Sequence, residues 1–441
     1  MGDRDSVRAA ISLRGARALY AALLLYAASA MNIRLIFVVG LPLIAAALVV
    51  AWRALRTDGS RSTGASGVWC GLSMMAALGV VATGTDGGWW FEVARRAYAI
   101  GGVAVVGVIA GGHQRWRRIA TNALLGAACV LLAWTPVATP SPFIDVFSWT
   151  TTATNAFLSG VHPYTVQAAD VYEGGRDFGF VTNVYPYMPA TILAYAPWVA
   201  LAGDFRFASA ASAAAALWLL RRAGRLASAS ATMIDAATLA LALHPQLFLV
   251  VRSGWTEPLL LAAAAGSVYL AARYPLGRAS AVALWLLPAF KQYALSPVVL
   301  QAALSDRVPR RVIVAGAALV AATMTPFLLW NPGATLHGTL FQMQAPLHPR
   351  LTSMSIPGLL FATGNPFPPI WLSAATELLA CVAVALVAKR RDLADLLIGT
   401  SVALLATFLV GWQAFVNYFY FVAGLLALGA MLSDTSIRCR A

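Results

Sequence analysis

A series of apolar runs, each near the length of a membrane crossing and separated by short basic clusters, constrains this chain most. Hydrophobic residues make up 60% of its 441 residues and charged residues only 11%. A water-soluble globule of this size needs more polar surface than that composition supplies. The runs are helix-length and rich in Leu, Ala and Val, without the alternation of barrel strands. The sequence therefore predicts an all-α, polytopic transmembrane helical bundle with about 13–15 membrane segments.

The charge is strongly positive, at +14, but its distribution explains it without a nucleic-acid partner. The basic residues stand in clusters between the apolar runs, as the positive-inside rule expects of cytoplasmic loops. We therefore expect a multi-pass protein of the plasma membrane, surrounded by membrane lipids. The four cysteines are scattered, with neither metal-ligand nor disulfide spacing. We expect no metal and no cofactor.

Counting crossings between the basic clusters divides the chain into three parts. Residues 1–118 hold extra N-terminal transmembrane helices, residues 119–330 form a central module, and residues 331–441 include the C-terminal helices. Two long loops are expected on the extracytoplasmic side, with interfacial helices in them: the first long loop, 139–185, and the second long loop, 331–369. The second is too apolar for a solvated linker, so we expect it to pack over the first.

The crossing count is inconsistent at one place. A cluster at Arg221, Arg222 and Arg225 favours the cytoplasmic side. Two full crossings between residues 186 and 220 would put that cluster outside. One of the two apolar segments is therefore expected to be short or re-entrant.

The first long loop contains FIDVFSWTTTATNAFLSGVHPYT, residues 143–165, in which Asp145 closely follows an apolar run. Ser141 and Pro142 have the types expected at the N-cap and first position of a helix over 142–158. Its polar and apolar residues occupy different faces, which predicts an amphipathic helix lying on the outer membrane surface. Asp145 is then either an acid favoured by the helix dipole or a functional carboxylate.

Two basic residues, Lys291 and Arg350, stand apart from the cytoplasmic clusters. Lys291 lies in the apolar stretch 279–304, which is too short for two crossings of about 20 residues each. We expect this stretch to be broken, with Lys291 near its tip. A lysine within a membrane is costly and functional by default, unless it snorkels to a headgroup.

Further polar residues occur at the outer ends of the expected helices. Arg252 and Glu257 flank a helix break and can either pair with each other or contact a ligand. His348, in the second long loop, either binds a ligand or has no task. Gln413, Asn417 and Tyr418 form a polar turn between the last two helices.

The first long loop carries two further motifs after its acid: GVHPYT at residues 160–165 and YPYMPATILAYAPW at residues 185–198. In their order and spacing these elements resemble the GT-C superfamily of membrane glycosyltransferases. They are most similar to the polyprenyl-phosphate-mannose-dependent mannosyltransferases of glycosyltransferase family 87 and their actinobacterial relatives. His162 stands where that family usually has Asn. Four extra helices precede the first motif, and no DxD-like second acid follows Asp145.

The resemblance implies a GT-C-like fold, with residues 119–330 as the catalytic module, and an inverting transfer of a sugar, mannose above all. The donor would be a polyprenyl-phosphate sugar and the acceptor a lipid or glycan hydroxyl at the extracytoplasmic face. Asp145 would be the general base. Lys291, Arg350 and His348 would bind the donor phosphate. The substrate-binding residues would be His162, Tyr164, Tyr185, Tyr187, Glu257, Arg252, Gln413 and Asn417. A membrane-interface aromatic belt explains the tyrosines of the loop equally well.

Other functions stay open. A polyprenyl-phosphate-dependent arabinofuranosyltransferase, or another pentosyl- or hexosyltransferase, needs the same base and the same phosphate site. A secondary transporter or lipid flippase would use Lys291, Glu257 and Asp204 as charges at the membrane midplane. Charges gather at the outer boundary and few acids besides Glu377 lie mid-helix, which favours the enzyme. A non-catalytic scaffold predicts that loss of Asp145 has no effect.

Overall fold

The computed structural model describes residues 10–29, 36–57, 62–81, 88–111, 114–171, 184–275, 278–305, 309–341 and 348–435. Parts of both long loops, 172–183 and 342–347, lie outside the described residues. The described chain is helical apart from loops and one short antiparallel strand pair, β1 (Ala10–Ser12) with β2 (Ser62–Gly64). The expected all-α architecture is confirmed.

The helices follow the apolar runs of the sequence closely. In the N-terminal part they are α1 (Leu13–Ser29), η1 (Ile36–Gly40), α3 (Leu41–Leu55), α4 (Ser66–Val81), α5 (Trp89–Ala110) and α6 (Gln114–Ala138). The central part contains α7 (Asp145–Leu158), α8 (Pro189–Ala202), α9 (Arg206–Leu226), α10 (Ala231–Ala242), α11 (Leu247–Arg252), α12 (Glu257–Arg273), α13 (Ala279–Ala283), α14 (Leu286–Phe290), α15 (Ser296–Leu304) and α16 (Arg310–Trp330). The last part contains α17 (Pro332–Leu336), η2 (His337–Phe341), α18 (Ile356–Ala362), α19 (Trp371–Val387), α20 (Leu393–Val410) and α21 (Val416–Leu432).

The lengths of these helices support a membrane protein. Within the described residues, five are long and apolar enough to cross a bilayer: Phe37–Leu55, Trp89–Ala110, Arg115–Ala138, Arg310–Trp330 and Leu393–Val410. Further apolar helices have only 10–17 residues, so length and composition alone give fewer crossings than the expected 13–15. One of them is α8, whose 14 residues span about 21 Å, less than a bilayer core of about 30 Å. Of the two segments between residues 186 and 220, α8 is therefore the short one.

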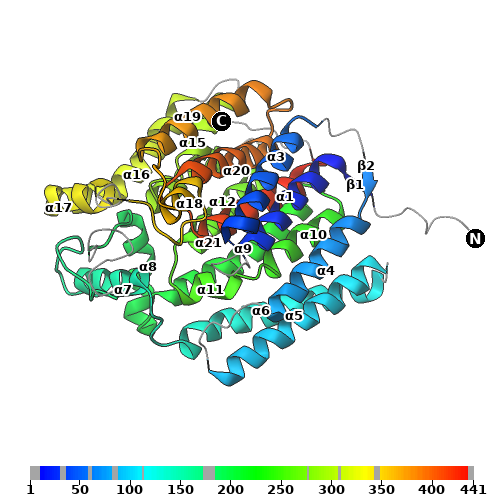
Figure 1. Cartoon of the computed structure of the whole chain (residues 1–441), viewed down its shortest axis with the longest axis horizontal. Coiled ribbons are helices and arrows are strands. Elements are labelled where there is room, and N and C mark those ends of the chain that lie inside the picture. Colours follow the sequence, from blue (N-terminus) through cyan, green and yellow to red (C-terminus); the bar gives the residue numbers. More distant parts are fainter. Residues whose placement is uncertain are drawn as a thin grey trace, which may run out of the picture.

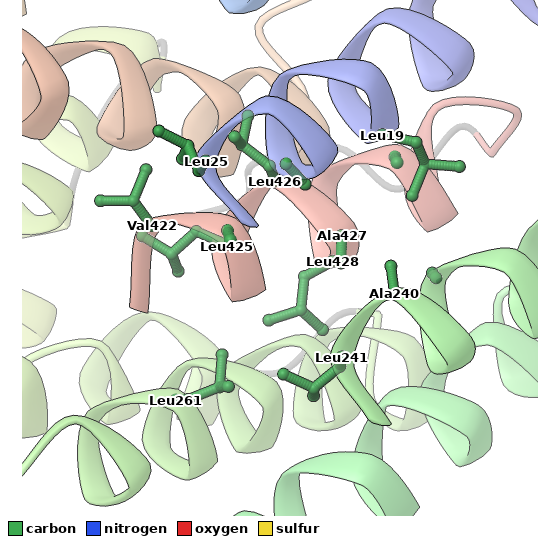
Figure 2. Close-up of a cluster of buried hydrophobic side chains, with 14 of the residues drawn as sticks. Leu19, Leu25, Ala240, Leu241, Leu261, Val422, Leu425, Leu426, Ala427 and Leu428 are labelled. Atoms are coloured by element: carbon green, nitrogen blue, oxygen red, sulfur yellow. The ribbon is translucent and has the colours of Figure 1, made fainter. Parts of the chain in front are cut away.

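The last helix, α21, lies at the centre of the bundle and is buried along almost its whole length. α1, α10, α12 and α20 pack around it (Figure 1). Figure 2 shows leucines of α21 lying between Leu19 and Leu25 of α1 and Leu241 and Leu261 of the helices opposite. The first helix of the chain and the last thus share one hydrophobic core.

The stretch 279–304 is broken, as its length predicts. It forms α13, α14 and α15, and Lys291 lies directly after α14 with extended backbone (φ −151°, ψ 128°). Pro297 stands in the first turn of α15, where its missing N–H costs nothing. The break places Lys291 and the two residues after it outside regular helix.

The expectation for α7 is wrong in two respects. The helix begins at Asp145, not at Pro142, because the carbonyl of Pro142 accepts a hydrogen bond from the N–H of Ile144 and turns the chain first. Ile144 occupies the N-cap position, so Ser141 does not cap the helix. On the face predicted to be polar, Asp145 is buried, Ser148 and Thr152 are half-buried and Asn155 is exposed, so only the second half of this face is open to solvent.

The second long loop packs over the first, as expected. Thr335 at the end of α17 contacts His162, and Gly338 in η2 lies against Tyr164. Arg350 reaches Asp145. Figure 1 shows α7, α8 and α17 together at the end of the molecule far from the N-terminus.

Candidate active site

Asp145 and Arg350 form a buried ion pair between the two long loops. Asp145 Oδ2 lies 3.0 Å from Arg350 Nη2, and Asp145 Oδ1 accepts a hydrogen bond of 2.7 Å from the N–H of Val146. Only 6% of Asp145 is exposed. Burial raises the pKa of the Asp145 carboxyl, and the Arg350 guanidinium opposes that rise. A carboxylate with a raised pKa is a better proton acceptor than one in water.

Lys291 and Glu257 form a second buried ion pair, with Nζ 2.6 Å from Oε1. Lys291 is 3% exposed and Glu257 fully buried. The hydroxyl of Tyr293 donates a hydrogen bond of 2.9 Å to the same oxygen. Glu257 stands at the first position of α12, where the helix dipole favours its negative charge. Its other oxygen, Oε2, has no hydrogen-bond partner in the described part of the chain.

Three tyrosine rings surround the ammonium group of Lys291. Its Nζ lies 5.0 Å from the ring centroid of Tyr187, 5.1 Å from that of Tyr293 and 4.8 Å from that of Tyr418. A cation within about 6 Å of a ring face is attracted by the quadrupole of the ring. The cage favours a charged Lys291 without adding a second carboxylate.

A cavity of about 410 Å³ opens beside this cage. Lys291, Gln292 and Tyr293 line its polar side, together with Tyr187, Tyr418 and Gln413. The remaining lining is largely apolar and comes from η2 and from α19, α20 and their ends: Leu340, Ile370, Trp371, Ser373, Ala374, Thr407, Phe408, Gly411 and Trp412. Trp371 is 65% exposed, so the apolar side reaches the outer face of the bundle. Such a lining suits an amphiphilic anion.

Aromatic side chains join the two ion pairs into one site. The guanidinium of Arg350 lies 5.5 Å from the ring centroid of Phe415, and the rings of Phe415 and Tyr418 are 5.8 Å apart. Tyr418 in turn belongs to the cage of Lys291. Burial chiefly raises the pKa of Tyr187, and Tyr418 and the carboxylates of Glu257 and Asp145 add to that rise.

His162, Tyr164 and Tyr185 of the first long loop form a layer of contacts next to Tyr187. The Nε2 atom of His162 lies 3.3 Å from the carbonyl oxygen of Phe327 and 3.2 Å from the hydroxyl of Thr335. Burial lowers the pKa of His162, and the hydrogen bond to the carbonyl of Phe327 opposes that change. Tyr164 donates a hydrogen bond of 2.6 Å to the carbonyl of Tyr187, and the ring of Tyr185 packs between those of Tyr164 and Tyr187.

Not all of the other residues expected in the site are found there. Gln413 lines the cavity, and Asn417 is buried with no partner for its Oδ1 among the described residues. Glu257 pairs with Lys291 and not with Arg252, whose carbonyl accepts a hydrogen bond from Arg206. The ring of His348 stacks on Phe361 at 4.3 Å, and its Nδ1 lies 3.0 Å from the carbonyl oxygen of Pro349.

The sequence reasoning missed Gln292 and Tyr293, which directly follow Lys291 and line the same cavity. The available signal was polarity: two polar side chains continue an apolar stretch next to its only lysine. Among the described residues, no three His, Cys, Asp or Glu side chains cluster as metal ligands. No protein-family model matches the chain, and no curated protein or solved structure matches it. A functional proposal therefore rests on the site itself.

Proposed function

We propose that this protein is an inverting, GT-C-like membrane glycosyltransferase with its site at the extracytoplasmic face. It transfers a sugar, mannose first among the options, from a polyprenyl-phosphate donor to a lipid or glycan hydroxyl. The observation that carries the proposal is the amphiphilic cavity, which has one caged cation on its polar side and is linked through Tyr418 and Phe415 to the Arg350–Asp145 pair.

The phosphate and the hydrocarbon chain of the donor match the polar and the apolar side of the cavity. Its phosphate lies against Lys291, which is held by Glu257 and the tyrosines but still lines the cavity. Its hydrocarbon chain follows the apolar wall towards Trp371 at the outside of the bundle. Cationic groups at that position stabilise the negative charge that grows on a leaving phosphate.

Asp145 is the proposed base. It takes the proton of the acceptor hydroxyl while the acceptor oxygen bonds to the anomeric carbon from the side opposite the phosphate. The bond between that carbon and the phosphate oxygen breaks, and the phosphate keeps the electron pair. Arg350 is bound to Asp145 before the donor enters and lies over Phe415, which neighbours Tyr418 of the cage, and we propose that it turns to the phosphate when the donor binds. That exchange would free the carboxylate for proton transfer.

A lipid flippase is the second candidate, because of Glu377 in α19. This acid lies one helical turn from Ser373 and Ala374, which line the cavity. Its Oε1 is buried and has no hydrogen-bond partner among the described residues. An acid within a membrane helix is functional by default. A flippase would bind the same lipid but leave the sugar attached.

The test uses purified full-length protein in lipid vesicles, labelled polyprenyl-phosphate-mannose and an acceptor extract from cell membranes. We expect transfer by the wild type and a loss of about 10²-fold or more in Asp145→Asn, which keeps the shape of the side chain. Asp434→Asn, at an exposed acid after α21, is the matched control. A pentose-phosphate donor in parallel separates the sugar classes. Movement of intact donor across the bilayer without transfer would favour the flippase over the enzyme.

A further inference from the structure

The carboxamide of Gln292 joins three segments of the chain at the wall of the cavity. Its Nε2 donates hydrogen bonds of 2.8 Å to the carbonyl of Pro186 and of 2.8 Å to the carbonyl of Thr339. Pro186 lies directly after the first long loop, before α8, and Thr339 belongs to η2 in the second long loop. Both amide hydrogens are therefore used, each on a different segment.

The direction of this carboxamide is fixed by its partners. Both partners are backbone carbonyls, which only accept hydrogen bonds, so a flipped amide would set oxygen against oxygen twice. A glutamate at this position has the same shape but no hydrogen to donate when ionised. The two bonds therefore require an amide.

Each joined segment supplies a neighbouring residue to the cavity wall. Tyr187, a ring of the cage, follows Pro186, and Leu340 follows Thr339. Gln292 itself stands between Lys291 and Tyr293, whose side chains both reach Glu257. Without the two hydrogen bonds of Gln292, Tyr187, Lys291 and Leu340 would be free to move independently of one another.

We propose that Gln292 is a positioning residue that holds Tyr187, Lys291 and Leu340 in register through its two carbonyl partners. It acts through these residues and not by reacting itself. This proposal rests on the proposed function only for the identity of the ligand. The loop contacts exist without any ligand, so they can be tested separately.

The test compares Gln292→Met, which removes both hydrogen bonds at similar length, and Gln292→Glu, which also places oxygens against the two carbonyls. Gln167→Met is the control, because Gln167 is an exposed glutamine of the first long loop. Hydrogen exchange is measured on full-length protein in lipid nanodiscs, in peptides covering residues 184–188 and 335–341. Binding of polyprenyl phosphate is followed by the fluorescence of tryptophan, because Trp371 and Trp412 line the cavity.

We expect faster exchange in both loop peptides, unchanged exchange in α20 and α21, and polyprenyl phosphate affinity lower by on the order of tenfold. The donor KM should rise more than kcat falls. Unchanged exchange and affinity in Gln292→Met would overturn the proposal. Lower affinity with unchanged loops would also overturn it, since Gln292 would then act by direct contact. Absence of sugar transfer in the wild type would count against the enzyme alone, because the exchange experiment still decides the role of Gln292.

Discussion

The surroundings of Asp145 in the structure differ from those that its position in the sequence predicts. The sequence places this acid at the start of a helix on the outer membrane surface, where the dipole contributes about 0.3–1 kcal/mol, and leaves open whether it is functional. In the structure the carboxylate is buried, and desolvation of a charge costs several kcal/mol unless it is paired. Its partner, Arg350, lies 205 positions along the chain. No local pattern predicts that pairing, although both residues stood out separately as unusual charges.

The pH dependence of transfer should report this pair. Asp145 acts as a base only when ionised, so kcat/KM should fall as the pH drops through its raised pKa. Arg350→Gln removes the charge that holds this pKa down, so the acidic limb should move to higher pH. Arg350→Lys keeps the charge and should move it less. Profiles for the three proteins check this, and an acidic limb that stays in place in Arg350→Gln would contradict the role of Asp145.

Substitutions in the Lys291–Glu257 ion pair should change the stability of the protein and its transfer activity to different extents. Glu257→Gln leaves Lys291 buried without its counter-charge, which should cost about 3–5 kcal/mol of unfolding free energy. Lys291→Met combined with Glu257→Gln removes both charges and should recover much of that loss. The double variant should still transfer no sugar, because the phosphate has lost its cation. Thermal unfolding in detergent and the transfer assay measure the two effects, and a double variant as active as wild type would exclude Lys291 from the site.

At the scale of elements, local sequence patterns predicted most of the helices but few of the contacts between them. The apolar runs located nearly every helix, and the short stretch 279–304 predicted the break at Lys291. The start of α7 was wrong, because the turn at Pro142 competes with the cap signal. The cage around Lys291 was not predictable as a unit, since two of its three rings, Tyr187 and Tyr418, come from segments far from Lys291 in the chain.

The contact between η2 and the first long loop gives a test at this scale. A Cβ on Gly338 would overlap the ring of Tyr164 and lie 3.0 Å from the carbonyl of Tyr185. Gly338→Ala should therefore cost about 1–3 kcal/mol by overpacking and lower transfer, since Tyr164 holds Tyr187. Gly333→Ala in α17 is the control, because its Cβ would meet nothing nearer than 3.8 Å. Equal melting temperatures and activities in the two variants would show that this contact is not needed.

At the scale of the whole molecule, the N-terminal helices belong to the same core as the C-terminal ones. The sequence treated residues 1–118 as extra helices before a separate module. In the structure α1 packs against α21, and α3 packs against α20. The division by crossing count could not show this, because the order of helices along a chain does not fix their order in a bundle. Removal of the N-terminal part would expose the apolar side of α21.

One substitution in the buried ion-pair cluster around Arg14, at the start of α1, can test whether the N- and C-terminal helices unfold together. Arg14 is fully buried and forms ion pairs with Asp392 and Asp395, at the start of α20. Arg14→Gln would leave the buried carboxylate of Asp395 without its cation, while Asp392 keeps its ion pair with Arg390, at a cost of about 3–5 kcal/mol. Because α1 and α20 share the central core, we expect one cooperative unfolding transition at lower temperature, with transfer unchanged well below it. Arg56→Gln, at an exposed arginine after α3, should leave the transition in place. A separate early transition confined to the helices of residues 13–110, seen by hydrogen exchange, would instead mean that the N-terminal helices fold as their own unit.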